Sequence, residues 1–242
     1  MSLHLLTRPK GENAEIRLKL EQSGQDCVEE NLLFIKKIRP GIKKLQEFLL
    51  INPPNSIIIT SKNAVFGLQF IFDKKTPVFV ISENMAKKLK DLGFKNIIIA
   101  KGDAKSLQEI LINYQPKEPI IYLRGEHIST EFINCTGISE HVIYRAKARL
   151  RFRKNIELLL AQQKISHVWL HSKRSAEVFL QCLKKSKLEN STKNLNIICQ
   201  SHSIASVLAQ NNWATINFPQ VATLQAMLEL KGKLELIPTP KN

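Results

Sequence analysis

The chain has 242 residues, of which 43% are hydrophobic, enough for one large or two small folded domains and too many for a disordered protein. Its formal charge is +15, from 36 basic and 21 acidic residues. This excess predicts an anionic partner, such as a phosphate, a polycarboxylate, nucleic acid or a membrane surface. The alternative is a lysine-rich composition that only solvates the surface.

No apolar run approaches the ~20 residues that cross a bilayer, and the first residues lack the apolar core of a signal peptide. We therefore expect a cytoplasmic protein.

Short apolar runs alternate with segments of helical periodicity along the whole chain. The predicted strands are 3–9, 27–38, 56–60, 76–81, 96–100, 119–123, 141–144, 167–170, 196–199 and 214–218. The predicted helices are 13–23, 42–50, 82–92, 102–114, 155–163, 201–209 and 223–230, with others after Ser61, Glu126 and Ser172. We expect a polar loop over 186–195 and a frayed tail from Pro238. This alternation predicts parallel sheets covered by helices on both faces.

One strand–turn–helix unit occurs twice. The first copy is Ser56–Val65, with Ser61-Lys62 at its turn, and the second is His167–Ala176, with Ser172-Lys173. Both serines occupy the position of a helix N-cap, where a hydroxyl accepts a hydrogen bond from a free helix amide.

Further landmarks recur in the same order, roughly 110 to 118 residues apart. The pairs are Thr7-Arg8-Pro9 with Leu123-Arg124-Gly125, Phe34 with Tyr144, Val80-Ile81-Ser82 with Ile198-Cys199-Gln200, and 106–111 with 223–228. Chance agreement among generic strand–helix junctions is the alternative. Together with the serine turns, these four pairs make five in one order, which favours an internal duplication and thus two related α/β domains.

Two such domains would meet across a cleft, with ligands bound by the loops at the carboxyl ends of the strands. Those loops are rich in hydroxyls, helix N-terminal amides and cations, which bind carboxylates and phosphates. The candidate binding residues are Arg8, Thr60, Ser61, Lys62, Arg124, Gly125, Ser172, Lys173, Ser201 and Ser203. Helix capping, strand-end turns and solvated surface charge are the alternative explanations for these residues.

Motifs for cofactors and metals are missing. The chain has no Gly-x-Gly-x-x-Gly after a strand, no Walker loop and no His-Glu-x-x-His, and its four cysteines form no Cys-x-x-Cys. We therefore expect no metal and no other cofactor, and we interpret Cys135 and Cys199 as small buried hydrophobic residues.

Several motifs together carry a family resemblance over nearly the whole chain. They are Leu6-Thr7-Arg8-Pro9, Ile59-Thr60-Ser61-Lys62-Asn63-Ala64-Val65, Leu92-Gly93-Phe94, Gly102-Asp103-Ala104-Lys105-Ser106-Leu107, Leu123-Arg124-Gly125-Glu126, Val142-Ile143-Tyr144, Ser172 and Ala222-Thr223-Leu224-Gln225-Ala226. With these motifs the chain resembles the uroporphyrinogen-III synthases. The resemblance implies an enzyme, a hydro-lyase of heme biosynthesis. It closes the linear tetrapyrrole hydroxymethylbilane to uroporphyrinogen III, with loss of water and inversion of ring D.

The resemblance also implies a discontinuous layout of two flavodoxin-like domains. Domain one combines 1–33 with 150–242, domain two is 41–143, and the segments 34–40 and 144–149 form a two-stranded linker. The expected protein is a monomer that needs no cofactor and binds neither nucleic acid nor membrane. A basic cleft suits a substrate with four acetates and four propionates.

Tyr144 matches the family tyrosine proposed to help the hydroxyl group leave, since a phenol can donate a proton or a hydrogen bond to the departing water. The alternative is a strand tyrosine that only packs its ring. Two positions depart from the family pattern, because Ser82 and Gln200 stand where a glycine is usual, and Glu83 adds a negative charge nearby. Two other functions therefore stay open: a non-catalytic module that binds polycarboxylates or nucleic acid, and a degenerate synthase.

Overall fold

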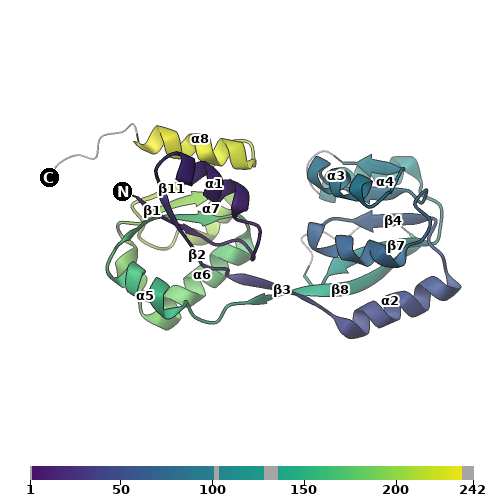
Figure 1. Ribbon diagram of the computed structural model, residues 1–242, viewed down its shortest axis with the longest axis horizontal. Helices are drawn as coiled ribbons and strands as arrows, with labels where there is room; N and C mark the ends of the chain where they lie inside the picture. The colour runs from purple at the N-terminus through teal and green to yellow at the C-terminus, as the bar shows by residue number, and fades with distance from the viewer. Residues whose placement is uncertain (1, 101–103, 128–135, 236–242) are drawn as a thin grey trace. The chain divides into compact units, whose positions relative to one another are not determined.

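The computed structural model describes the backbone of residues 2–100, 104–127 and 136–235 (Figure 1). The chain forms two compact units, unit 1 from residues 1–34 and 147–242 and unit 2 from residues 35–146. Each is a three-layer α/β unit. No helix among the described residues is long and apolar enough to cross a membrane.

Unit 1 is built on a five-stranded parallel sheet with the order β11-β10-β9-β1-β2. Its strands are β1 (Leu3–Leu6), β2 (Asp26–Glu29), β9 (Ile165–Leu170), β10 (Asn196–Cys199) and β11 (Thr215–Asn217). Its helices are α1 (Ala14–Gln22), α5 (Lys154–Ala161), α6 (Lys173–Ser186), η2 (Glu189–Thr192), α7 (His202–Leu208) and α8 (Leu224–Glu235). Side chains from α5, α6 and α7 form the core on one face of the sheet, and those from α1 and α8 form it on the other.

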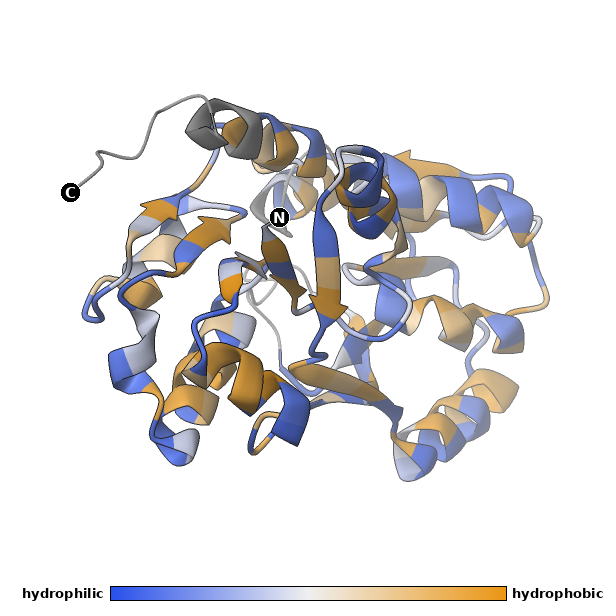
Figure 2. Ribbon diagram, turned by 60° about the vertical axis from the view of Figure 1, so that its left-hand side comes forward, coloured by the Kyte–Doolittle hydropathy of each residue, from blue (hydrophilic) through white to orange (hydrophobic). Residues whose placement is uncertain are grey.

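Unit 2 is built on a six-stranded sheet with the order β3-β8-β7-β4-β5-β6. Its strands are β3 (Leu33–Lys37), β4 (Ser56–Ile59), β5 (Val78–Val80), β6 (Ile97–Ile99), β7 (Ile120–Gly125) and β8 (Ile138–Ala148). Its helices are α2 (Arg39–Ile51), η1 (Lys62–Phe70), α3 (Glu83–Asp91) and α4 (Ala104–Tyr114). Helices α2, η1 and α3 cover one face, and α4 covers the other. Hydrophobic residues dominate many of the strands (Figure 2), and β4 and β5 are buried along their whole length, as expected for strands covered on both faces.

The two sheets share one spatial strand order. From β2 to β11, unit 1 has the order β2-β1-β9-β10-β11, and unit 2 has β8-β7-β4-β5-β6. This order places the ends of β1 and β7, the serine turns after β4 and β9, and helices α4 and α8 at equivalent positions, which supports the predicted internal repeat. Phe34 and Tyr144 are an exception, because Phe34 is 36% exposed beneath Arg149 whereas Tyr144 is buried.

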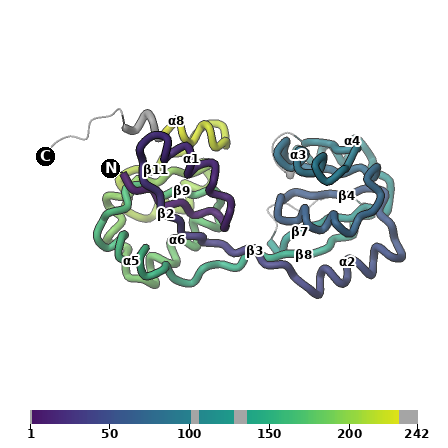
Figure 3. The backbone as a smooth tube through the Cα atoms, in the orientation of Figure 1, coloured from purple at the N-terminus to yellow at the C-terminus, as the bar shows by residue number. Residues whose placement is uncertain are grey.

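The chain passes between the units twice, inside β3 and inside β8 (Figure 3). These strands are neighbours at the edge of the larger sheet, with hydrogen bonds from Ile38 N–H to the Ile143 carbonyl and from Arg149 N–H to the Leu32 carbonyl. The expected linker segments, 34–40 and 144–149, contain both crossings. The predicted domain bounds, 1–33 with 150–242 and 41–143, stay a prediction.

The segment 27–38 is two strands, β2 and β3, where the sequence predicts one. Glu30 lies between them and is fully buried. Its carboxylate pairs with Arg149 Nε at 3.1 Å and Arg153 Nε at 2.6 Å. A buried carboxylate needs such partners, and this ion pair fixes the bend between the strands.

Two helices also differ from expectation. Helix α2 begins at Arg39 and not at residue 42, because Pro40 fits the first helical turn, where no N–H donor is needed. The segment after Ser61 is a 3₁₀ helix, η1, and not an α-helix. It contains Gly67, a poor α-helix former, where an added Cβ would lie 2.7 Å from Ile143 Cδ1.

Other predictions have varied outcomes. The strands near residues 76–81, 96–100 and 214–218 are confirmed in shortened form, and β8 is longer than expected. Within 186–195, residues Glu189–Thr192 form a 3₁₀ helix. The helix expected after Glu126, Cys135 and the tail from Pro238 lie outside the described residues, apart from Glu126 and His127. Cys199 is buried as predicted.

Candidate functional site

In unit 2, the carboxyl ends of β4 and β7 lie next to Tyr144 of β8. The strand order β8-β7-β4 makes these three segments neighbours. It therefore brings together Thr60 and Ser61 after β4, Arg124 and Gly125 at the end of β7, and Tyr144, five of the predicted site residues. Lys62, a sixth, begins η1 directly after Ser61. We call this group of six residues the unit 2 edge.

Successive hydroxyl residues at the end of β4 hold two different tyrosines. The Ser61 hydroxyl is close enough to Tyr144 to lower the pKa of its phenol, whose ring belongs to the core beneath α2 and η1. Thr60 Oγ1 lies 2.7 Å from the hydroxyl of Tyr122, whose ring belongs to the core beneath α4. Since neighbouring side chains on an extended segment point to opposite faces, one phenol is held on each face of the sheet.

Tyr144 is only 8% exposed, and burial raises the pKa of its phenol above the ordinary value of 10. The Ser61 hydroxyl opposes this shift without cancelling it. The phenol is thus protonated at neutral pH and can act as a donor.

Gly125 lies directly against the Tyr144 ring. A Cβ atom at position 125 would be 2.6 Å from Tyr144 Cζ and 2.8 Å from its hydroxyl oxygen, far inside van der Waals contact. The two residues face each other in the β7–β8 ladder, next to a register shift between Arg124 and Gly125. Such β-bulges redirect a side chain, and here only glycine leaves room for the phenol.

Arg124 is engaged by protein groups. Its Nε donates to Glu140 Oε2 at 2.7 Å, and its Nη1 donates to the carbonyl oxygen of Gly125 at 3.0 Å. Both partners belong to the unit 2 sheet, so the guanidinium is fixed at the sheet edge.

In unit 1, the remaining predicted site residues follow β1, β9 and β10, which are also neighbouring strands. Arg8 after β1 pairs with Glu12 at 3.5 Å. Ser172 caps α6 in a reciprocal arrangement with Ser175, and Lys173, the first residue of α6, is exposed. After β10, Ser201 and Ser203 bring their hydroxyl oxygens within 3.0 Å of each other, and Ser201 makes no side-chain capping bond to α7.

The two residues in place of family glycines use their side chains locally. Ser82 accepts a hydrogen bond from the Met85 amide at the start of α3. Gln200 Nε2 donates to the Ala222 carbonyl oxygen at 3.0 Å. Glu83 is exposed in the first turn of α3, where a helix favours negative charge.

Tyr122 and Glu140 are site neighbours that the sequence reasoning missed. Tyr122 and Arg124 are two residues apart on one strand, a spacing that puts both on one face. That spacing was the available signal for Tyr122. Glu140 precedes the predicted strand 141–144, and no sequence feature marks it as a site residue. Its ion pair with Arg124 depends on the register of β7 and β8, which the sequence does not reveal.

Comparison with known proteins decides the family. A sequence profile described as uroporphyrinogen-III synthase HemD matches residues 14–229, most of the chain. The chain belongs to the uroporphyrinogen-III synthase family. No individual curated protein sequence matches it.

Two solved structures share the fold. One is a mutant uroporphyrinogen III synthase from the extremely thermophilic bacterium Thermus thermophilus, with 12% identity, a TM-score of 0.60 and coverage of 98% of this chain and 100% of that chain. The other is the uroporphyrinogen-III synthetase from Helicobacter pylori, with 18% identity, a TM-score of 0.60 and coverage of 97% and 100%. At these identities the likeness shows the fold, and the predicted fold of two mostly parallel α/β sheets is confirmed.

Proposed function

We propose that this protein is a uroporphyrinogen-III synthase, which converts hydroxymethylbilane into uroporphyrinogen III with loss of water and inversion of ring D. The observation that carries the proposal is the family match over residues 14–229. The unit 2 edge supports it, because it holds a protonated phenol among hydroxyl groups.

Tyr144 is the proposed catalytic residue. The bond between the hydroxymethyl carbon and its oxygen breaks, and the Tyr144 hydroxyl donates a hydrogen bond or a proton to the oxygen that departs as water. An azafulvene cation remains on the bilane. Ring D then attacks this cation through its substituted carbon to give a spiro intermediate. The bond from that carbon to its original methylene bridge breaks and re-forms at the other α carbon of ring D, which loses a proton. This proton balances the one that left with the water, and no external reductant or oxidant is needed.

Eight of the remaining site residues bind carboxylates in this proposal. The substrate carries acetates and propionates, which accept hydrogen bonds from hydroxyls and pair with cations. Thr60, Ser61 and Lys62 supply such groups in unit 2. Arg8, Ser172, Lys173, Ser201 and Ser203 supply them in unit 1. Positioning of the flexible bilane in a reactive geometry is the expected main source of rate.

The proposed partner is therefore a small linear tetrapyrrole and not nucleic acid. Aromatic residues are 7% of the chain. Two of its three tyrosines, Tyr122 and Tyr144, are buried, and buried rings cannot stack on bases. We also keep the cytoplasmic location and the monomeric state as proposals.

The test supplies freshly made hydroxymethylbilane to the full chain and separates the oxidised uroporphyrin isomers by chromatography. We expect isomer III. Isomer I alone, formed at the spontaneous rate, would contradict the proposal and favour a degenerate synthase, for which the substitutions at Ser82 and Gln200 are the specific observation. Salt-sensitive binding of RNA without turnover would favour the binding module.

A further inference from the structure

The ion pair between Arg124 and Glu140 is part of a closed chain of contacts around Tyr144. Glu140 and Tyr144 lie on β8, on either side of the register shift between β7 and β8. Arg124 lies opposite on β7 and bonds the Glu140 carboxylate and the Gly125 carbonyl with two different nitrogens. The Tyr144 ring in turn packs against the backbone of Gly125. The contacts thus run from Glu140 through Arg124 and Gly125 to Tyr144.

We propose that Arg124 is a positioning residue for Tyr144, held by Glu140, and not a direct ligand of a substrate carboxylate. The catalytic part of this inference rests on the proposed function, whereas the placement of the Tyr144 ring does not.

The geometry of the guanidinium supports this role. Its planar fork presents Nε to one partner and Nη1 to another at the same time, and the short ammonium of lysine cannot reproduce this pair of bonds. The Arg124 side chain is only 18% exposed, compared with 40% for Glu140. The charge-assisted hydrogen bond from Arg124 Nη1 to the Gly125 carbonyl is partly buried and restrains the Gly125 peptide. Because the Tyr144 ring packs against Gly125, this restraint also keeps the phenol in place.

The two possible roles of Arg124 predict opposite effects of Glu140→Gln. If Arg124 binds a substrate carboxylate, removal of the competing Glu140 charge frees the guanidinium, so KM falls. If Arg124 positions Tyr144, the same substitution loosens the Gly125 peptide, so kcat falls and KM changes little. A misplacement of about 1 Å can cost up to ~100-fold in rate, and a partial loosening should cost about tenfold.

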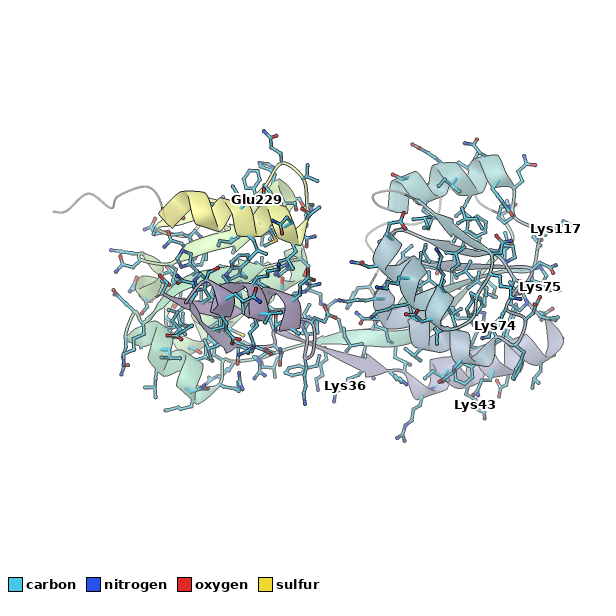
Figure 4. All side chains as sticks on the ribbon, turned by 45° about the horizontal axis from the view of Figure 1, so that its top comes forward. Lys36, Lys43, Lys74, Lys75, Lys117 and Glu229 are labelled. Atoms are coloured by element: carbon cyan, nitrogen blue, oxygen red, sulfur yellow. The ribbon has the colours of Figure 1, made fainter. Side chains whose placement is uncertain are left out.

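The experiment compares Glu140→Gln and Arg124→Lys with Lys75→Gln in the full chain. Lys75 is exposed and lies just before β5, and Lys117 lies just before the parallel strand β7 (Figure 4). Both lysines thus mark the amino ends of the strands, opposite to the unit 2 edge. Lys75→Gln therefore removes a charge at the far end of the same sheet. Steady-state turnover of hydroxymethylbilane gives kcat and KM. Carbon-13 labelling of the tyrosine Cζ atoms gives a second readout by NMR, because the chain has three tyrosines and each Tyr→Phe variant assigns one signal.

In the parent protein, the Tyr144 signal should titrate above pH 10, since burial raises its pKa. In Glu140→Gln and Arg124→Lys, the Tyr144 pKa should fall toward the ordinary value of 10, with kcat about tenfold lower. Lys75→Gln should match the parent in both readouts.

A lower KM with an unchanged Tyr144 titration in Glu140→Gln would overturn the proposal. The NMR titration needs no substrate, so it keeps the two questions separate. The parent protein could form only isomer I while the Tyr144 titration still shifts in Glu140→Gln. This result would contradict the proposed function and would still support the positioning role of Arg124.

Discussion

The serine turns of the two units share a Ser-Lys pair and differ in their hydrogen bonds. In unit 1, the Ser172 hydroxyl accepts a hydrogen bond from the Ser175 amide at 3.1 Å and lies 3.0 Å from the Ser175 hydroxyl. Both hydrogen bonds of this hydroxyl are thus made with the first turn of α6. In unit 2, Ser61 accepts from the Asn63 amide at 3.2 Å, and its hydroxyl also lowers the pKa of the nearby Tyr144 phenol. The Ser172 hydroxyl is thus engaged at the start of α6, whereas the Ser61 hydroxyl lies beside the proposed catalytic phenol.

The difference originates in the neighbouring strand. Unit 2 ends β7 with Gly125, and the missing Cβ makes room for the Tyr144 ring next to the serine turn. The corresponding segment after β1 in unit 1 is Thr7-Arg8-Pro9, and Thr7 is buried with its hydroxyl donated to the Trp169 carbonyl. A duplicated scaffold therefore carries a phenol at one edge and a structural cap at the other.

The largest expected effect is that of Tyr144→Phe. Loss of the hydroxyl removes the proposed donor to the departing water, and general acids contribute ~100-fold or more to rate. The rate of isomer III formation by each variant measures this loss. Tyr122→Phe is the matched control on the opposite face of the sheet, and it should retain most of the activity. Equal losses in both variants would contradict the distinction between the two phenols.

Gly125→Ala should lower kcat by roughly ten- to 100-fold, because the new Cβ forces the Tyr144 ring to move. Overpacking should also cost about 1–3 kcal/mol in the free energy of unfolding. Kinetics and urea denaturation measure the two effects. Since Gly125 acts through Tyr144, the double variant with Tyr144→Phe should lose little more activity than Tyr144→Phe does; fully multiplicative losses would refute this dependence.

Substitution of the two serines should give a crossed pattern. Ser172→Ala removes the cap of α6 and should cost about 1 kcal/mol of stability with little change in kcat. Ser61→Ala should reduce kcat several-fold with a smaller loss of stability, since one hydrogen bond contributes about 1 kcal/mol. Turnover and urea denaturation of both variants test it, and identical behaviour would remove the contrast between the units.

The smallest expected effect concerns alkaline stability. The pKa of Tyr144 is raised in the folded protein above the ordinary value of 10. Its contribution to stability is therefore fully present below pH 10 and is lost as the pH rises through the folded pKa. The free energy of unfolding should decline less steeply above pH 10 in Tyr144→Phe than in the parent. Parallel declines would show that the phenol is not buried as described.

The sequence predicts the architecture well because strand and helix periodicity, the two serine turns and the family motifs all extend along the chain. It does not reveal local features that depend on tertiary contacts. The bend at Glu30 requires arginines more than 100 positions away, and the 3₁₀ form of η1 depends on close packing of Gly67 against β7 and β8. The Arg124–Glu140 pair likewise depends on strand register. Residue types at the candidate site are thus predictable, and their bonding partners are not.

The fraction of isomer III formed at increasing enzyme concentration, from a fixed amount of hydroxymethylbilane, tests the central claim most directly. Spontaneous closure yields isomer I and competes with the enzyme. We predict that the fraction of isomer III rises toward one with the parent protein, and needs far more protein with Tyr144→Phe. A fraction that stays at zero at every concentration of the parent would contradict the account.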